Sequence, residues 1–223
     1  MRVKILRQRG PFGKSYWQAF RYEGSLDGTV ASLLDDLNFR DDIEDEDGNP
    51  VPRISWECSC LQGSCGSCAM VINGRPALAC EVFLRDVKGG ELTIRPLRKF
   101  PVISDLVVDR AGIQANLQKA GIFIEEYAQT DKKEYGHQYS VAKCLKCGLC
   151  LEVCPNYVKG ERFYGAAFAN DCYLVTTRSK EQQTRIRQEY AEHFARGCSG
   201  ALSCMDVCPA KLPTLASIAK MNR

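Results

Sequence analysis

The sequence has no long apolar run, little histidine and little net charge, and each shortage excludes a class of protein. No apolar stretch in the 223 residues approaches the roughly 18 residues that cross a bilayer. The formal net charge is only +3, with Lys and Arg spread among nearly as many acids, so we expect no nucleic-acid partner. Residues 1–7 are repeatedly charged and have no apolar core, which predicts that they are not a secretory signal peptide.

Catalytic patterns are missing as well. No nucleophile stands in a recognisable arrangement with a base, and there is neither a Walker loop nor a Gly-x-Gly-x-x-Gly turn opening a helix. A Rieske centre needs two histidine ligands on one iron, whereas His137 and His193 stand alone and far from the first cysteine set. We interpret both histidines as structural, and we assign no catalytic residue to this chain.

Cysteine, in contrast, is abundant, with 13 residues. Eleven of them fall into three spaced sets, and C-x2-C spacings favour metal binding over disulfides. We therefore expect a reducing compartment, most simply the cytoplasm. Of the two remaining cysteines, Cys58 is interpreted as a spare thiol beside Cys60, and Cys172 as a small buried hydrophobic residue.

The first set predicts a plant-type 2Fe–2S cluster. Its spacing is C-x4-C-x2-C followed by a more distant fourth cysteine. Gly66 has no side chain, so the backbone can approach the cluster there and donate N–H groups to sulfur. A structural zinc site is the alternative, although zinc commonly uses two pairs of ligands. The predicted ligands are Cys60, Cys65, Cys68 and Cys80.

The other two sets repeat one motif. Residues 144–155 read C-x2-C-x2-C-x3-C-P, the pattern of bacterial ferredoxins, and residues 198–209 repeat it with Ala201 in place of the second cysteine. Alanine cannot bind iron, so the second copy predicts a 3Fe–4S cluster. The alternative is a cubane completed by water, or by Ser199 or Ser203.

In two-cluster ferredoxins the fourth cysteine of each run binds the other cluster. Applied to this chain, the 4Fe–4S ligands are Cys144, Cys147, Cys150 and Cys208. The 3Fe–4S ligands are Cys154, Cys198 and Cys204. This crossing connects the two halves of the domain through metal, so loss of either cluster should destabilise the fold.

The patterns between the motifs predict an α+β, two-domain protein. Strands are expected near residues 3–6, 16–22, 69–72 and 92–97, and a helix from near Thr29. Helical patterns follow at residues 102–110, 113–120 and 181–195. We expect a β-grasp, 2Fe–2S ferredoxin-like domain at residues 1–103 and an all-α, bacterial-ferredoxin-like domain with 4Fe–4S and 3Fe–4S clusters at residues 104–223.

These motifs, with Leu78-Ala79-Cys80, Arg95-Pro96-Leu97 and residues 100–109, resemble the iron–sulfur subunit of succinate dehydrogenase and fumarate reductase over nearly the whole chain. The resemblance implies an electron-transfer subunit of that enzyme. Electrons would pass between FAD on a partner flavoprotein, which acts on the dicarboxylate, and a quinone through the 2Fe–2S, 4Fe–4S and 3Fe–4S clusters. The quinone would lie at a membrane-anchor partner, with or without haem b. The chain would lie peripherally on the cytoplasmic side of the membrane.

Two positions depart from the family pattern. Leu61 stands where members often have Arg, and no Trp follows Cys154-Pro155 as it does in ubiquinone-using members, which favours menaquinone. Lys159 and Lys211 are candidates to approach the quinone, and solvated or lipid-facing lysines are the simpler interpretation. The alternative function is a soluble relay for a thiol- or ferredoxin-linked flavoprotein reductase that uses no quinone.

Overall fold

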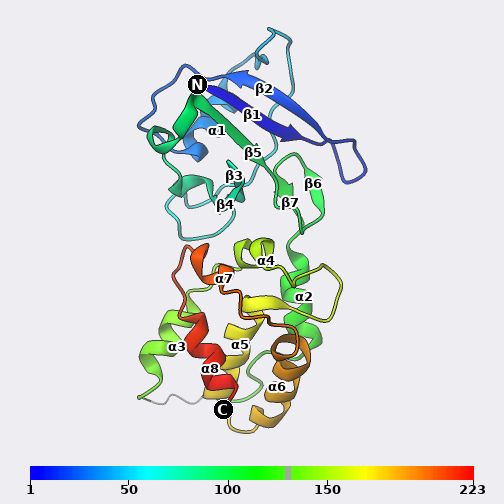
Figure 1. Cartoon of the computed structure of the whole chain (residues 1–223), viewed down its shortest axis with the longest axis vertical. Coiled ribbons are helices and arrows are strands. Elements are labelled where there is room, and N and C mark those ends of the chain that lie inside the picture. The colour runs from blue at the N-terminus through cyan, green and yellow to red at the C-terminus, as the bar shows by residue number, and fades with distance from the viewer. Residues whose placement is uncertain (129–131) are drawn as a thin grey trace. The chain divides into compact units, whose positions relative to one another are not determined.

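In the computed structural model the chain forms two units, Met1–Asp109 and Arg110–Arg223 (Figure 1). The structure describes residues 1–128 and 132–223. Residues 104–109 lie in the first unit, and the domain boundary after residue 103 stays a sequence-based prediction.

A five-stranded sheet forms the first unit, in the order β2-β1-β5-β3-β4. β1 runs parallel to β5, and every other neighbouring pair in this sheet is antiparallel. The four strands predicted from alternation are confirmed, whereas β4, which follows the tight turn at Asn73-Gly74, was not anticipated. The strands are β1 (Arg2–Arg7), β2 (Tyr16–Arg21), β3 (Ala69–Ile72), β4 (Arg75–Leu78) and β5 (Glu91–Arg95).

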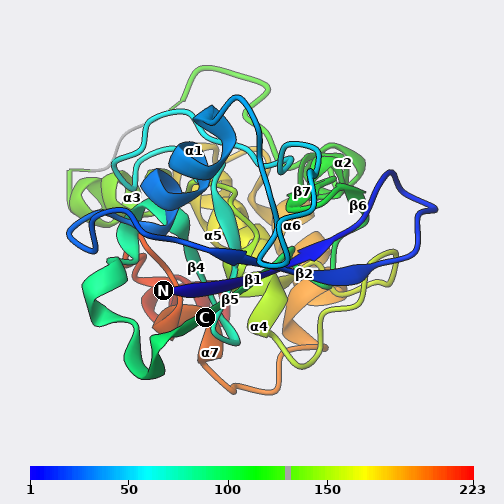
Figure 2. The ribbon, with the colours of Figure 1, turned by 90° about the horizontal axis from the view of Figure 1, so that it is seen from above.

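Helix α1 (Val30–Phe39) begins where the sequence predicted. Thr29 accepts a hydrogen bond from the Ser32 N–H, and the Ser32 hydroxyl oxygen accepts one from the Thr29 N–H, which together cap the helix. Figure 2 shows α1 lying across one face of the sheet. The core of the unit includes Val3, Ile5, Phe20, Leu33, Leu34, Leu37, Leu92 and Ile94. Short 3-10 turns lead from β4 to β5 at Ala79–Glu81, Leu84–Asp86 and Lys88–Gly90.

The prediction of a helix over residues 102–110 is wrong. These residues form the hairpin of β6 (Val102–Ser104) and β7 (Val107–Val108). Valine and isoleucine favour strands, and Asp105 has a φ of +45°, which belongs to a turn and not to a right-handed helix.

Asp105 also holds the hairpin in place. Its buried carboxylate accepts the N–H of Gln8 at 3.0 Å and the N–H of Ser55 at 2.9 Å. The Nε of Arg7, itself buried, lies 3.0 Å from one carboxylate oxygen. Because Ser55 precedes the first cysteine set, Asp105 fixes the backbone that leads into that set.

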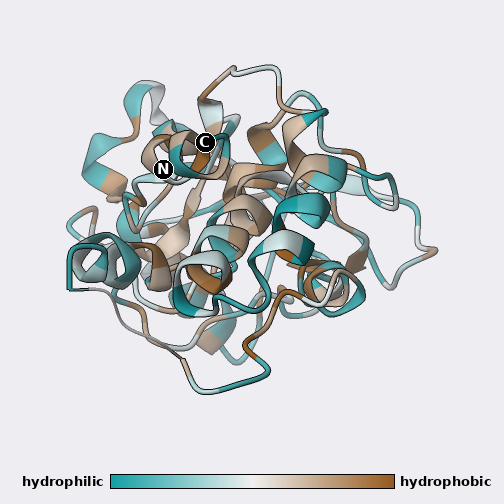
Figure 3. Ribbon diagram, turned by 90° about the horizontal axis from the view of Figure 1, so that it is seen from below, coloured by the Kyte–Doolittle hydropathy of each residue, from teal (hydrophilic) through white to brown (hydrophobic). Residues whose placement is uncertain are grey.

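The second unit is helical, as predicted. Its longest helix, α5, packs against α2, α3, α4, α6 and α8. In Figure 3 its helices carry both brown and teal stretches, as amphipathic helices do. The helices are α2 (Ala111–Lys119), α3 (Tyr135–Ala142), α4 (Leu149–Val153), α5 (Gly165–Arg178), α6 (Gln183–Tyr190), α7 (Ser203–Asp206) and α8 (Thr214–Met221).

The helix predicted over residues 181–195 is present with one difference. α6 gives way to a π-helical turn, Ala191–Ala195, just before the second cysteine run. This turn places Phe194 in the hydrophobic core, where its ring stacks 5.5 Å from that of Phe163. Within the described part of the chain, no helix has both the length and the apolar character to span a bilayer.

Candidate metal centres

Cys60, Cys65 and Cys68 lie in a loop before β3, and Cys80 lies in the 3-10 turn after β4. Backbone N–H groups of the loop point at sulfur. Gly63 donates its N–H to the Cys80 sulfur at 3.2 Å, and Gln62 and Ser64 donate theirs to the Cys60 sulfur at 3.5 and 3.3 Å. Gly63 and Gly66 have positive φ, of +71° and +80°, which a residue with a side chain rarely adopts. These glycines let the loop curl around its own cysteines.

Two thiols of this set lie close together. The sulfur atoms of Cys68 and Cys80 are 3.4 Å apart. Hydrogen bonds, above all from the Ser67 hydroxyl, lower the pKa of Cys65 to about 6, whereas burial raises the pKa of Cys80 to about 12. A metal that binds these sulfurs displaces their protons.

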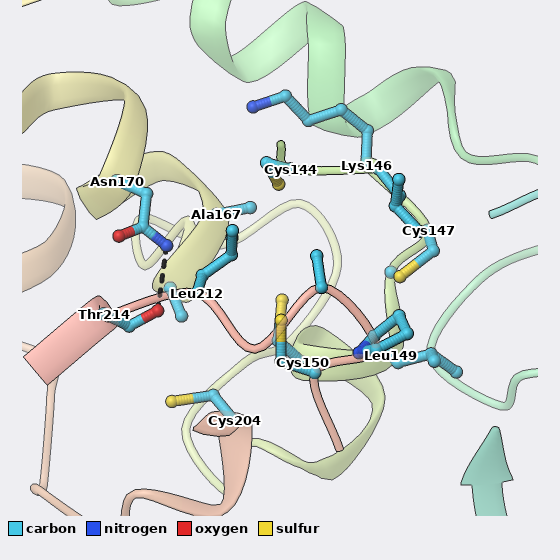
Figure 4. Close-up of a pocket in the computed structure, with 16 residues that line it drawn as sticks. Cys144, Lys146, Cys147, Leu149, Cys150, Ala167, Asn170, Cys204, Leu212 and Thr214 are labelled. Atoms are coloured by element: carbon cyan, nitrogen blue, oxygen red, sulfur yellow. Dashed lines mark hydrogen bonds between the residues drawn. The ribbon is translucent and has the colours of Figure 1, made fainter. Parts of the chain in front are cut away.

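The first cysteine run of the second unit surrounds a cavity with about 450 Å³ of atom-free space. Ala166 and Ala167 of α5 form part of its wall, and their small side chains leave room for a bulky group. Figure 4 shows Cys150 and Cys204 on facing segments of this wall. The cysteines that line the cavity are Cys144, Cys147, Cys150, Cys204 and Cys208.

These thiols lie in an apolar setting. Burial raises the pKa of Cys147 to about 11 and that of Cys150 well above its ordinary value. Gly148, with a φ of +86°, lets the chain turn sharply into α4 between these two cysteines. Buried thiolates need a compensating cation, and iron provides one.

A charged pair flanks the same cavity. The Lys146 ammonium group forms an ion pair and hydrogen bond with the Asp171 carboxylate on α5. Burial is the main reason that the pKa of Cys144 is raised; Lys146 lowers this pKa, and Asp171 raises it. Both charges therefore act on the cysteine that opens the run.

The second cysteine run surrounds a cavity of its own, with about 410 Å³ of atom-free space. Cys154, Cys198 and Cys204 line it, and so does Ala201. Ser199 and Ser203 are in the same wall, so the structure leaves open the alternative of a serine ligand. Ala166 and Cys204 line both cavities, which are therefore neighbours.

Asn156 connects the two runs at the second cavity. Its side-chain amide donates a hydrogen bond to the Gly197 carbonyl and accepts one from the Ser199 hydroxyl at 3.4 Å. These two partners bracket Cys198 in the sequence, while Asn156 itself follows Cys154-Pro155.

The cysteines, histidines and lysines that the sequence singled out beyond the predicted cluster ligands occupy varied surroundings. Cys58 is exposed and Cys172 is fully buried. The His137 ring lies 4.5 Å from that of Tyr173, and its Nε2 is 3.0 Å from the Ser217 hydroxyl. The His193 ring stacks on Tyr164. Lys159 and Lys211 are exposed.

The geometry fits iron–sulfur clusters. Several cysteine thiols line each of the two cavities of the second unit, and thiolate sulfur is the ligand that holds iron–sulfur clusters. Sequence reasoning missed Lys146, Asp171 and Asn156, because their partners are distant in sequence and no spacing rule signals them.

Comparisons with known proteins agree with this geometry. A family model described as a 2Fe-2S iron-sulfur cluster binding domain matches residues 2–115, and a 4Fe-4S dicluster domain model matches residues 140–212. The chain is 30% identical to the succinate dehydrogenase iron-sulfur subunit of Bacillus subtilis, in an alignment that covers 100% of this chain and 91% of the relative. The chain belongs to the family of succinate dehydrogenase and fumarate reductase iron–sulfur subunits.

Other members of the family are similar over the same length. The fumarate reductase iron-sulfur subunit of Wolinella succinogenes is 28% identical, with 94% of this chain and 90% of the relative covered. The fold is shared with a chain of the Mycobacterium smegmatis Sdh1 complex, at a TM-score of 0.75 and 21% identity, over 99% of this chain and 93% of that one. The protein is therefore an iron–sulfur electron-transfer subunit of an oxidoreductase.

Proposed function

We propose that this chain relays electrons between the FAD of a succinate or fumarate flavoprotein subunit and a membrane quinone. A 2Fe–2S, a 4Fe–4S and a 3Fe–4S cluster would supply the one-electron carriers. The missing Trp after Cys154-Pro155 favours menaquinone. An anchor subunit, with or without haem b, would hold the chain at the cytoplasmic face of the membrane.

The cavity walls support the crossed ligand assignment. Cys208, from the second run, lines the cavity of the first run, and Cys154, from the first run, lines the cavity of the second. We therefore assign the 4Fe–4S cluster to Cys144, Cys147, Cys150 and Cys208. We assign the 3Fe–4S cluster to Cys154, Cys198 and Cys204, and the 2Fe–2S cluster to Cys60, Cys65, Cys68 and Cys80.

The chain itself contributes binding, orientation and hydrogen bonds to sulfur. The N–H groups of Gln62, Gly63 and Ser64 donate to ligand sulfurs, and such hydrogen bonds are one of the levers on a cluster potential. The two cavities of the second unit share Ala166 and Cys204, a proximity that suits electron transfer between groups bound in them.

One observation carries the proposal: Ala201 lines the second cavity, where three cysteines and no fourth are present. A cluster held by three thiolates fits this wall. A 3Fe–4S cluster, with its higher potential, suits a quinone acceptor, whereas a low-potential donor would favour a complete cubane.

The test is low-temperature EPR spectroscopy of the air-oxidised complex, followed by stepwise reduction. We expect a signal at roughly g = 2 in the oxidised state that disappears on mild reduction, from a 3Fe–4S cluster. Two low-potential cubane signals without it would refute this assignment and favour the soluble relay.

The partners are tested separately. Succinate-dependent quinone reduction should require both a flavoprotein and an anchor subunit. A preparation that is active with succinate and quinone but contains no anchor would contradict the membrane link.

A further inference from the structure

We propose that the Lys146–Asp171 ion pair sets the reduction potential of the group bound in the first cavity, with its two charges acting in opposite directions. This inference rests on the proposed 4Fe–4S assignment. Neither residue belongs to the predicted ligand set, and both lie in the second unit.

The position of Lys146 places its charge at the cavity. Lys146 lies between Cys144 and Cys147 and lines the cavity wall. Its φ of +53° is unusual for a residue with a side chain, so this backbone conformation is imposed by the cysteine loop around it. Figure 4 shows the side chain extending from the loop past Cys144.

Asp171 supplies the opposite charge through its ion pair with Lys146. It lies on α5 four residues after Ala167, which lines the cavity, so the two residues project from the same side of the helix. The side chains of Lys146 and Asp171 are only 25% and 14% exposed, so solvent screens their charges weakly.

Charge decides the direction of each effect. One-electron reduction makes a cluster more negative, so a neighbouring cation raises its potential and a neighbouring anion lowers it. In the intact pair the two effects largely cancel. Removing either partner exposes the effect of the other.

The experiment measures the reduction potential of the 4Fe–4S EPR signal in the full complex, at one fixed pH for all variants. Lys146→Met keeps the length of the side chain and should shift the potential down. Asp171→Asn keeps the shape and should shift it up. At a fixed potential, each should change the ratio of reduced to oxidised cluster by roughly tenfold.

Three further variants separate charge from structure. The double variant Lys146→Met/Asp171→Asn should return the potential close to that of the unchanged protein. Lys146→Arg should keep it, because the charge is retained. Lys180→Met, which removes an exposed lysine just beyond α5, is the control and should leave it unchanged.

The outcomes are distinct. Potentials that do not move, or that move in the same direction in both single variants, overturn the inference. Loss of the 4Fe–4S signal in both single variants, with retention in Lys146→Arg, would make the pair a structural clamp and also overturn it. Absence of a 4Fe–4S signal from the unchanged protein would instead refute the proposed function.

Discussion

The buried ion pair that anchors the β6–β7 hairpin allows a quantitative prediction. Asp105→Asn keeps the shape of the side chain but removes the counter-ion of buried Arg7, and it places an NH₂ group against one of the N–H donors of Gln8 and Ser55. Breaking a buried ion pair costs about 3–5 kcal/mol, and loss of a hydrogen bond to a charged group costs about 1.5–3 kcal/mol. Because these two costs overlap, we expect a total destabilisation of about 4 kcal/mol.

Tryptophan fluorescence reports this change selectively. The chain has two tryptophans, Trp17 and Trp56, and both lie in the first unit. With a slope near 2 kcal/mol per molar urea, the unfolding midpoint of the anaerobic full chain should fall by roughly 2 M. The expected loss of about 4 kcal/mol is a large share of the free energy of unfolding, which is typically about 5–15 kcal/mol.

Two controls test the reasoning. Asp42→Asn makes the same chemical change at an exposed site and should alter stability by less than about 0.5 kcal/mol. The double variant Arg7→Met/Asp105→Asn leaves no unpaired buried charge, so it should lose less stability than the sum of the two single variants. A midpoint for Asp105→Asn equal to that of Asp42→Asn would refute the argument.

Three other changes have defined outcomes. Ala201→Cys adds a thiolate to the second cavity and should replace the 3Fe–4S EPR signal with a second cubane signal; an unchanged signal would contradict the missing-ligand assignment. Gly160 and Gly165 both have a positive φ, so replacing either with alanine should lower the free energy of unfolding in urea by about 1 kcal/mol. Gly165→Ala should cost roughly 1–3 kcal/mol more, because its Cβ would lie 2.2 Å from a buried leucine of α4. Hydrogen bonds, chiefly from Lys220, lower the pKa of Glu134 below its ordinary 4.5, so its contribution to stability is present above that pH and is lost as the pH falls below it. Glu134→Gln should therefore be less stable by about 1 kcal/mol at neutral pH, and urea midpoints should converge in acid; a constant difference would contradict the ion pair.

The sequence predicted the cysteine sets because ligand spacing is local information. The strands and α1 were also accessible, since alternation and the i, i+3, i+4 pattern follow from one buried face. The hairpin that contains Asp105 could not be predicted, because Gln8 and Ser55, whose N–H groups donate hydrogen bonds to Asp105, lie far away in the sequence. A short apolar run such as residues 102–110 is compatible with a helix or a strand, and only tertiary contacts determine which of the two forms.

Helix α5 was missed for a related reason. It is buried on most sides, with ten of its 14 residues inaccessible, so it shows no clear polar face. The Lys146–Asp171 and Asn156 contacts were hidden for the same reason as the Asp105 contacts, since only folding brings their partners together.

The wall that the two cavities share has a consequence for how this family can vary. Ala166 and Cys204 each face two cavities, whereas Ala167 faces one. A larger side chain at Ala166 would intrude on both binding spaces at once, so a compensating change near one of them would not restore the other. Among natural variants we therefore expect fewer accepted replacements at Ala166 than at its neighbour Ala167, even though both are small residues on the same helix.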